Sequence, residues 1–198
     1  MTANRALGTL VKALGLLVVC GGAHPALALS IYVQFDEALR SSPLVAWVQI
    51  ESGELMTSTS GRACGARYTA RVLHGIKGAQ EGQRIQFGQF VGHAIGSQYF
   101  VFLQSTASLA PAAVSECRDM LPPYSETDEG MGTLPVSNGT TLGYKPAVEL
   151  WSTLYEIPAQ WVGQRPHTGV IANGLLIGDV QIETEAFYEF LRALAAKQ

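Results

Sequence analysis

The first half of this 198-residue chain is dominated by short apolar segments separated by turns, and this pattern constrains the fold most strongly. Segments at 43–50, 67–72, 83–87 and 96–103 are rich in β-branched, aromatic and other apolar residues, and glycine or serine lies close to their ends. Strands spaced this closely favour a sandwich or a small barrel. The chain is therefore expected to be mainly β.

Two of these segments also predict how the strands are covered. Tyr68, Ala70 and Val72 fall on one face of their strand, and the residues between them, which include Arg71, fall on the other. This two-residue period places one face in a core and the other toward water. The segment at 96–103 ends in a continuous apolar run, which predicts a strand covered on both faces.

The second half of the chain predicts two hairpins. Segments 134–142 and 170–177 each contain an Asn-Gly pair, at 138–139 and 173–174. Asn-Gly suits a two-residue type I′ turn, in which both central residues take positive φ. Between the hairpins, 148–157 favours a strand, although its apolar spacing also fits a helical face.

A helix is expected at the end of the chain. Thr184 is a residue type that caps helices, and the apolar residues after it recur at helical spacing. These residues are Phe187, Phe190, Leu191 and Leu194. The stripe favours docking on the barrel over binding a separate partner.

The first residues predict an export signal. Arg5 and Lys12 precede a short apolar run, and small residues follow as far as Ala28, which is the pattern of a secretory signal peptide. We place cleavage between Ala28 and Leu29. The alternatives are a retained N-terminal helix or anchor, and a lipoprotein cleaved before Cys20, although the preceding valine is larger than lipoprotein processing usually requires.

The mature chain, 29–198, has the length of one ordinary domain. Its expected barrel core lies at 44–117, and 118–198 forms an extension with the hairpins and the final helix. Loss of 1–28 removes two cations and no acid, so the formal net charge changes from −3 to −5. A mildly acidic chain without a basic run argues against nucleic-acid binding, and no mature segment is long and apolar enough to span a membrane.

Two cysteines remain after cleavage, Cys64 and Cys117. In an oxidising compartment, an even pair predicts a disulfide. The alternative is a nucleophilic cysteine with a histidine partner such as His74, but a catalytic thiol must stay reduced. We therefore expect a Cys64–Cys117 disulfide and a periplasmic or secreted protein.

No catalytic, cofactor-binding or metal-ligating residue is assigned from the sequence. His74, His93 and His167 lack the spacing of a metal motif. The acidic residues of the loop expected at 121–130 do not match a calcium-binding loop, and a solvated acidic loop is favoured. Those acidic residues are Glu126, Asp128 and Glu129.

Residues 44–117 resemble a known family of barrels. The strands "SPLVAWVQI", "CGARYTARVLHGIKG", "EGQRIQF" and "GSQYFVFL", followed by the cysteine in "SEC", look like the N-terminal OB-type barrel of the tissue inhibitors of metalloproteinases. They are also similar to the related netrin modules, and still more to small exported bacterial proteins with that barrel. The resemblance implies an OB-like barrel that acts as a binding or interaction module.

The resemblance does not carry over the zinc-chelating mechanism of those inhibitors. That mechanism uses an N-terminal cysteine, whereas the predicted mature chain begins at Leu29-Ser30. The expected function is a non-enzymatic binding module of the cell envelope with an unknown protein partner, contacted through the 119–133 loop or the 67–72 strand face. The alternatives are a periplasmic hydrolase-type enzyme, recognisable if a histidine meets a serine or carboxylate in a pocket, and an envelope protein anchored at Cys20.

Overall fold

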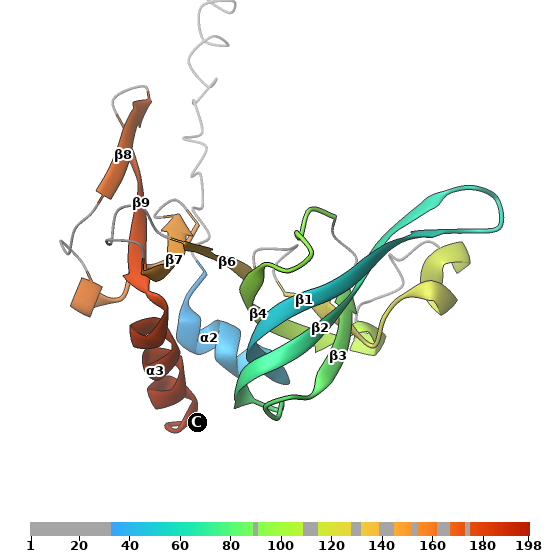
Figure 1. Ribbon diagram of the computed structural model, residues 1–198, viewed down its shortest axis with the longest axis horizontal. Helices are drawn as coiled ribbons and strands as arrows, with labels where there is room; N and C mark the ends of the chain where they lie inside the picture. Colours follow the sequence, from blue (N-terminus) through green and yellow to red (C-terminus); the bar gives the residue numbers. More distant parts are fainter. Residues whose placement is uncertain are drawn as a thin grey trace, which may run out of the picture. The chain divides into compact units, whose positions relative to one another are not determined.

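The computed structural model describes residues of the unit Ile31–Gln198 (Figure 1). The described residues are 33–88, 91–108, 115–127, 132–138, 145–151, 154–161, 167–172 and 175–198. The predicted signal peptide, Cys20 and the cleavage position lie outside them. None of the described helices is long and apolar enough to cross a membrane.

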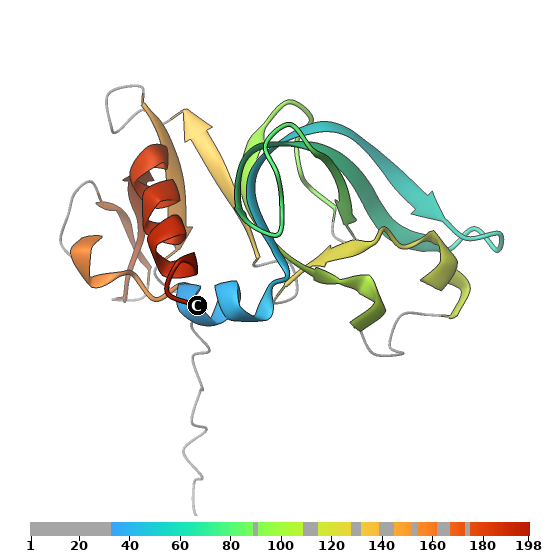
Figure 2. The ribbon, with the colours of Figure 1, turned by 90° about the horizontal axis from the view of Figure 1, so that it is seen from below.

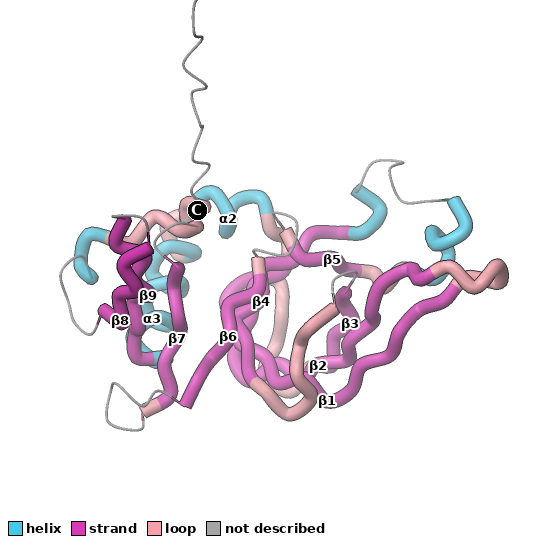
Figure 3. The backbone as a smooth tube through the Cα atoms, turned by 90° about the horizontal axis from the view of Figure 1, so that it is seen from above, coloured by secondary structure: helices cyan, strands magenta, loops and turns pink. Residues whose placement is uncertain are grey.

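Five strands form a closed ring, whose course is seen in Figure 3. They are β1 (Leu44–Thr57), β2 (Ala63–Lys77), β3 (Arg84–Gly88), β4 (Gln98–Ser105) and β5 (Tyr124–Glu126). The pairing order is β1-β2-β3-β5-β4, and β1 also pairs with β4, which closes the ring. The β3–β5 pairing is parallel, and the other pairings in the ring are antiparallel.

The ring encloses an apolar core made by alternate residues of its strands. Tyr68, Ala70 and Val72 of β2 face this core together with Ile85 and Phe87 of β3, so the two-residue period predicted for β2 is confirmed. On the opposite face of β2, Arg71 is exposed and Arg67 is partly buried, and both pair with glutamates of β1. The two-residue alternation therefore separates the side chains that face the interior of the ring from those on its outer face.

A second core covers the outer faces of β1 and β4. Trp47 of β1, and Phe100 and Phe102 of β4, point away from the ring interior and pack with residues of two helices. These helices are α2 (Phe35–Ser41) and α3 (Thr184–Ala195). The prediction that the 96–103 segment is covered on both faces is confirmed.

Four further strands extend the sheet from β4, in the order β6-β7-β9-β8. They are β6 (Thr133–Asn138), β7 (Pro146–Trp151), β8 (His167–Ala172) and β9 (Leu175–Glu183). The second predicted hairpin is confirmed, because Ala172 pairs with Leu175 across a two-residue connection. The first is wrong, because Asn138 pairs with Pro146 and the strands are joined by a longer connection; Gly139 lies outside the described residues.

The expected strand at 148–157 is present as far as Trp151, within β7. The final helix is confirmed, but Thr184 is its first residue and Glu183 occupies the cap position, without a side-chain hydrogen bond to the helix. Helix α2 was not expected from the sequence. Its Phe35, Ala38 and Leu39 have helical spacing and are buried, but seven residues give too short a pattern to recognise.

Three short 3-10 helices complete the described elements: η1 (Thr106–Ser108), η2 (Ser115–Met120) and η4 (Ala159–Trp161). Helix η2 carries Cys117, and β2 begins next to Cys64. In Figure 1, the β1–β2 hairpin extends as a long arm toward η2. The disulfide described below joins these two parts.

Candidate functional site

The predicted disulfide between Cys64 and Cys117 is confirmed. Both cysteines are buried, and together with Met56 they form a small apolar cluster on the hairpin arm, against which Met120 and Leu121 pack. The bond joins residues 53 apart in the sequence, with a Cα–Cα distance of 5.4 Å. Cys64 is therefore a structural cysteine, and the nucleophilic alternative does not hold in this disulfide-bonded form.

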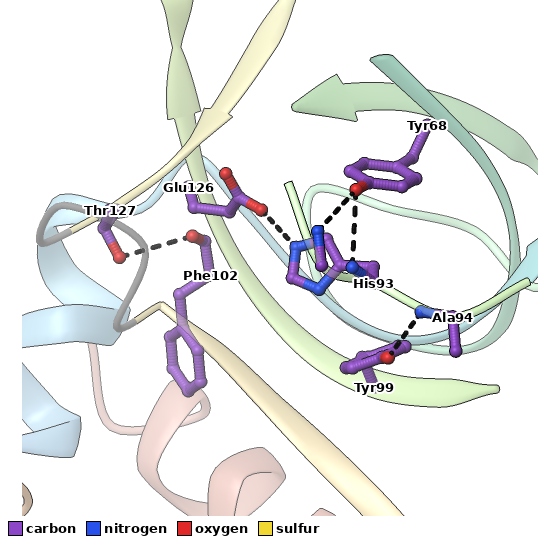
Figure 4. A network of polar contacts seen from close by, with 8 residues as sticks. Tyr68, His93, Ala94, Tyr99, Phe102, Glu126 and Thr127 are labelled. Carbon is purple, nitrogen blue, oxygen red and sulfur yellow. Dashed lines mark hydrogen bonds and ion pairs between the residues drawn. The ribbon is translucent and has the colours of Figure 1, made fainter. Parts of the chain in front are cut away.

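A histidine and a carboxylate meet inside the mouth of the ring. The Nε2 atom of His93 lies 2.5 Å from Oε1 of Glu126 (Figure 4). The side chain of Glu126 is 0% exposed and that of His93 is 14% exposed. The prediction that Glu126 belongs to a solvated acidic loop is wrong, because Glu126 is the last residue of β5 and closes the ring next to β4.

Aromatic rings of the core enclosed by the five strands surround the imidazole of His93. Its ring centroid lies 4.8 Å from that of Tyr68, 5.0 Å from that of Tyr99 and 5.9 Å from that of Phe87. A charged or polar side chain is costly in such surroundings unless a partner satisfies it. Glu126 is that partner, and its other oxygen, Oε2, is buried without a hydrogen-bond partner among the described residues.

The loop that carries His93, residues 91–97, is tied down along its backbone. The hydroxyl of Tyr68 accepts hydrogen bonds from the amides of Gly92 and His93, and the hydroxyl of Tyr99 accepts one from Ala94 (Figure 4). Gly92 and Gly96 have φ values of +123° and +83°, which a residue with a side chain rarely adopts. We call this segment the anchored loop.

The far end of the anchored loop is joined to β1. The amide of Gly96 donates to the carbonyl of Ile50 at 2.8 Å, and the amide of Ile50 donates to the carbonyl of Ser97 at 3.0 Å. The side chain of Gln49 also donates to the carbonyl of Gly96. The loop is thus held by the ring interior in its first part and by a strand in its last part.

Two apolar side chains of the anchored loop face water. Val91 and Ile95 are each 65% exposed, although they are large apolar residues. They flank His93, whose side chain is only 14% exposed, so the loop has an inward polar anchor and an outward apolar surface. A fixed loop that exposes apolar side chains can bind a partner without paying the full entropy of loop ordering.

The other residues considered from the sequence lie elsewhere. His74 is partly exposed, packs between the rings of Trp47 and Tyr188, and lies 3.8 Å from a carboxylate oxygen of Glu81. The side chain of His167, and Asp128 and Glu129, lie outside the described residues. Among the described residues, no group of three or more histidine, cysteine or acidic side chains is arranged to hold a metal ion.

The anchored loop was not identified as a site from the sequence. Its glycines indicate a loop, but the pairing of His93 with Glu126 depends on the parallel β3–β5 contact between segments far apart in the chain. Comparison with known protein families, curated proteins and solved structures yields no match to this chain.

Proposed function

We propose that this chain is an exported, non-enzymatic protein-binding module on an OB-type barrel, with the anchored loop as its contact surface. The observation that carries the proposal is the exposure of Val91 and Ile95 on a loop whose backbone is fixed by Tyr68, Tyr99 and β1. Apolar residues presented by a preorganised loop suit an apolar pocket on a partner protein.

Two features support the barrel type and the compartment. The ring order β1-β2-β3-β5-β4, closed by β1 and β4, fits a five-stranded OB-type barrel, which binds ligands through a strand face and loops. The Cys64–Cys117 disulfide favours an oxidising compartment and hence export. The proposed surface differs from the 119–133 loop and the 67–72 face, because Glu126 is buried and the arginines of β2 pair with glutamates.

The His93–Glu126 pair also invites an enzymatic interpretation, since histidine and carboxylate pairs occur in hydrolase sites. The side chain of Glu126 is closed to solvent and that of His93 is 14% exposed, and the backbone amide of His93 donates to the hydroxyl of Tyr68. A substrate would reach the carboxylate only after the site had opened. The geometry therefore favours a structural role for the pair, which holds the loop in place. It favours this role more than a role in general base catalysis.

Site-specific crosslinking tests the proposed surface. A photoreactive amino acid at position 95 in the exported protein should capture a discrete partner in the native envelope fraction, whereas the same group at the exposed Leu55 should not. In a pull-down, Val91→Asp with Ile95→Asp should abolish capture, and Leu55→Asp should leave it unchanged. Equal capture from both positions, or no effect of the loop substitutions, would contradict the proposal.

The lipid-anchored alternative remains a prediction from Cys20. It is separated from the soluble module by membrane fractionation of the wild-type protein and a Cys20→Ser variant. An anchor at Cys20 requires the wild-type protein to sediment with membranes and the variant to be released. The binding proposal concerns the anchored loop and holds for either form.

A further inference from the structure

A cleft of about 590 Å³ lies between the ends of three elements in the second core region. Arg40 at the end of α2, Lys77 at the end of β2 and Arg192 in the last turn of α3 line it. Figures 1 and 2 show α2 and the end of the chain side by side, and the side chain of Gln198 donates to the backbone carbonyl of Asp36. The three cations therefore line one cleft, although the chain carries a net charge of −3.

The cations are held in different ways. The ammonium of Lys77 donates to the carbonyls of Leu39, at 2.5 Å, and Arg40, at 3.4 Å, so it is fixed at the C-terminal end of α2. The guanidinium of Arg192 lies 5.5 Å from the centre of the Tyr188 ring. Lys77 is thus a positioned positive charge at the cleft, with the arginines beside it.

Both arginines also have acidic neighbours on their own helices. Arg40 pairs with Asp36 and Arg192 pairs with Glu189, and all four side chains are largely exposed. Exposed pairs of this kind contribute little free energy. The guanidinium groups can therefore turn toward an anion at the cleft at small cost.

The rest of the lining is partly apolar. Ile76, Ala195 and Ala196 lie beside the cations, and Gln198 completes the lining. Guanidinium groups bind phosphate, sulfate and carboxylate through paired hydrogen bonds. An apolar wall next to them favours a ligand that carries a hydrocarbon chain beside its anionic head.

We propose that this cleft binds an amphiphilic organic anion, whose phosphate, sulfate or carboxylate head contacts Arg40, Lys77 and Arg192 and whose alkyl part contacts Ile76, Ala195 and Ala196. The ligand is either a soluble small molecule or the head group and adjoining chain of an anionic lipid. None of the lining residues belongs to the anchored loop, so this site is independent of the proposed protein-binding surface.

The first experiment is a titration of isotope-labelled exported protein with monomeric octyl phosphate, followed by amide and methyl NMR signals. Signals of Ile76, Lys77, Ala195 and Ala196 should shift in a saturable way, and inorganic phosphate should bind more weakly. Absence of saturable shifts at the cleft would overturn the proposal. Equal affinity for inorganic phosphate would overturn the amphiphilic assignment.

Charge reversal provides the matched control. Arg40→Glu with Arg192→Glu should weaken octyl phosphate binding by about tenfold or more, as expected for the loss of charged hydrogen bonds. Arg40→Glu alone should also weaken binding, whereas Arg84→Glu, which makes the same single reversal at an exposed arginine on β3, should leave the affinity unchanged. Equal weakening by Arg84→Glu would show that only overall charge matters and would overturn the site.

The two sources of the ligand are separated with vesicles. The lipid head group would be assigned if the protein sediments with phosphatidylglycerol vesicles but not with phosphatidylcholine vesicles. The double arginine variant should then no longer sediment with phosphatidylglycerol vesicles. Octyl phosphate binding without vesicle binding would assign a soluble anion. Lys77 is left unchanged in these tests because it holds the carbonyls at the end of α2. Unfolding curves should show that both charge variants are folded.

Discussion

At the scale of single residues, His93 and Glu126 hold each other in the otherwise apolar mouth of the ring. They are separated by 33 residues in the sequence and meet because β5 inserts between β3 and β4. Removing one member of a buried ion pair leaves the other without a partner for its charge, which typically lowers the free energy of unfolding by about 3–5 kcal/mol. The anchored loop therefore depends on an interaction that the ring itself creates.

We expect His93→Gly to lower the thermal unfolding midpoint strongly and free imidazole to restore part of it. The added imidazole would occupy the space between Tyr68, Phe87 and Tyr99 and donate to Glu126. His74→Gly is the matched control, because His74 lies partly exposed on the outer face of β2 and imidazole should not rescue it. Rescue of both variants, or of neither, would contradict the anchor.

Local sequence patterns could be predicted from the residues, whereas pairings between distant segments could not. The inward face of β2 follows from a two-residue period that needs no tertiary information. The burial of Glu126 does not follow from any local pattern, because its neighbours along the chain are mostly prolines, polar residues and acids. Only closure of the ring places that carboxylate beside an imidazole.

At the scale of elements, the hairpin arm of β1 and β2 is joined to η2 by the Cys64–Cys117 disulfide. We expect replacement of both cysteines by serine to reduce the free energy of unfolding by about 4 kcal/mol, as chain entropy predicts for a loop of this length. Urea unfolding of the oxidised wild-type protein and the variant measures the difference. A change below about 1 kcal/mol would show that the arm keeps its position without the bond.

Helix α3 covers the outer face of the sheet through Phe187, which is fully buried, while Phe190 is only partly buried. Phe187→Ala should therefore destabilise the protein by about 3–5 kcal/mol, and Phe190→Ala should destabilise it less. Chemical unfolding of both variants makes the comparison. Equal losses would mean that the helix does not dock on the face assigned to it.

The elements with long, regular patterns were predicted, and the short or irregular ones were not. Helix α3 has an apolar stripe over about three turns, whereas α2 has only about two turns, which is too short for its apolar spacing to stand out from the flanking sequence. The partner of β6 was missed because an Asn-Gly pair suggested a tight turn, while Asn138 instead continues the strand beside Pro146. Tertiary pairing overrode the local turn preference there.

At the scale of the whole described unit, β1 and β4 belong to two cores at once. Their inward residues fill the ring, and Trp47, Phe100 and Phe102 fill the second core with the helices. We expect both cores to unfold together, so tryptophan fluorescence and far-ultraviolet circular dichroism should give coincident unfolding transitions. Two separated transitions would show that the helical side and the ring are independent.

The ring presents residues 91–97 as a fixed loop. Amide hydrogen exchange of the free protein, resolved at Gly92, His93, Ala94 and Gly96, tests whether the loop is fixed. These amides donate to Tyr68, Tyr99 and Ile50, so they should exchange much more slowly than an unstructured loop, and His93→Gly should remove the protection of the first three. Exchange at unprotected rates in the wild-type protein would contradict the claim.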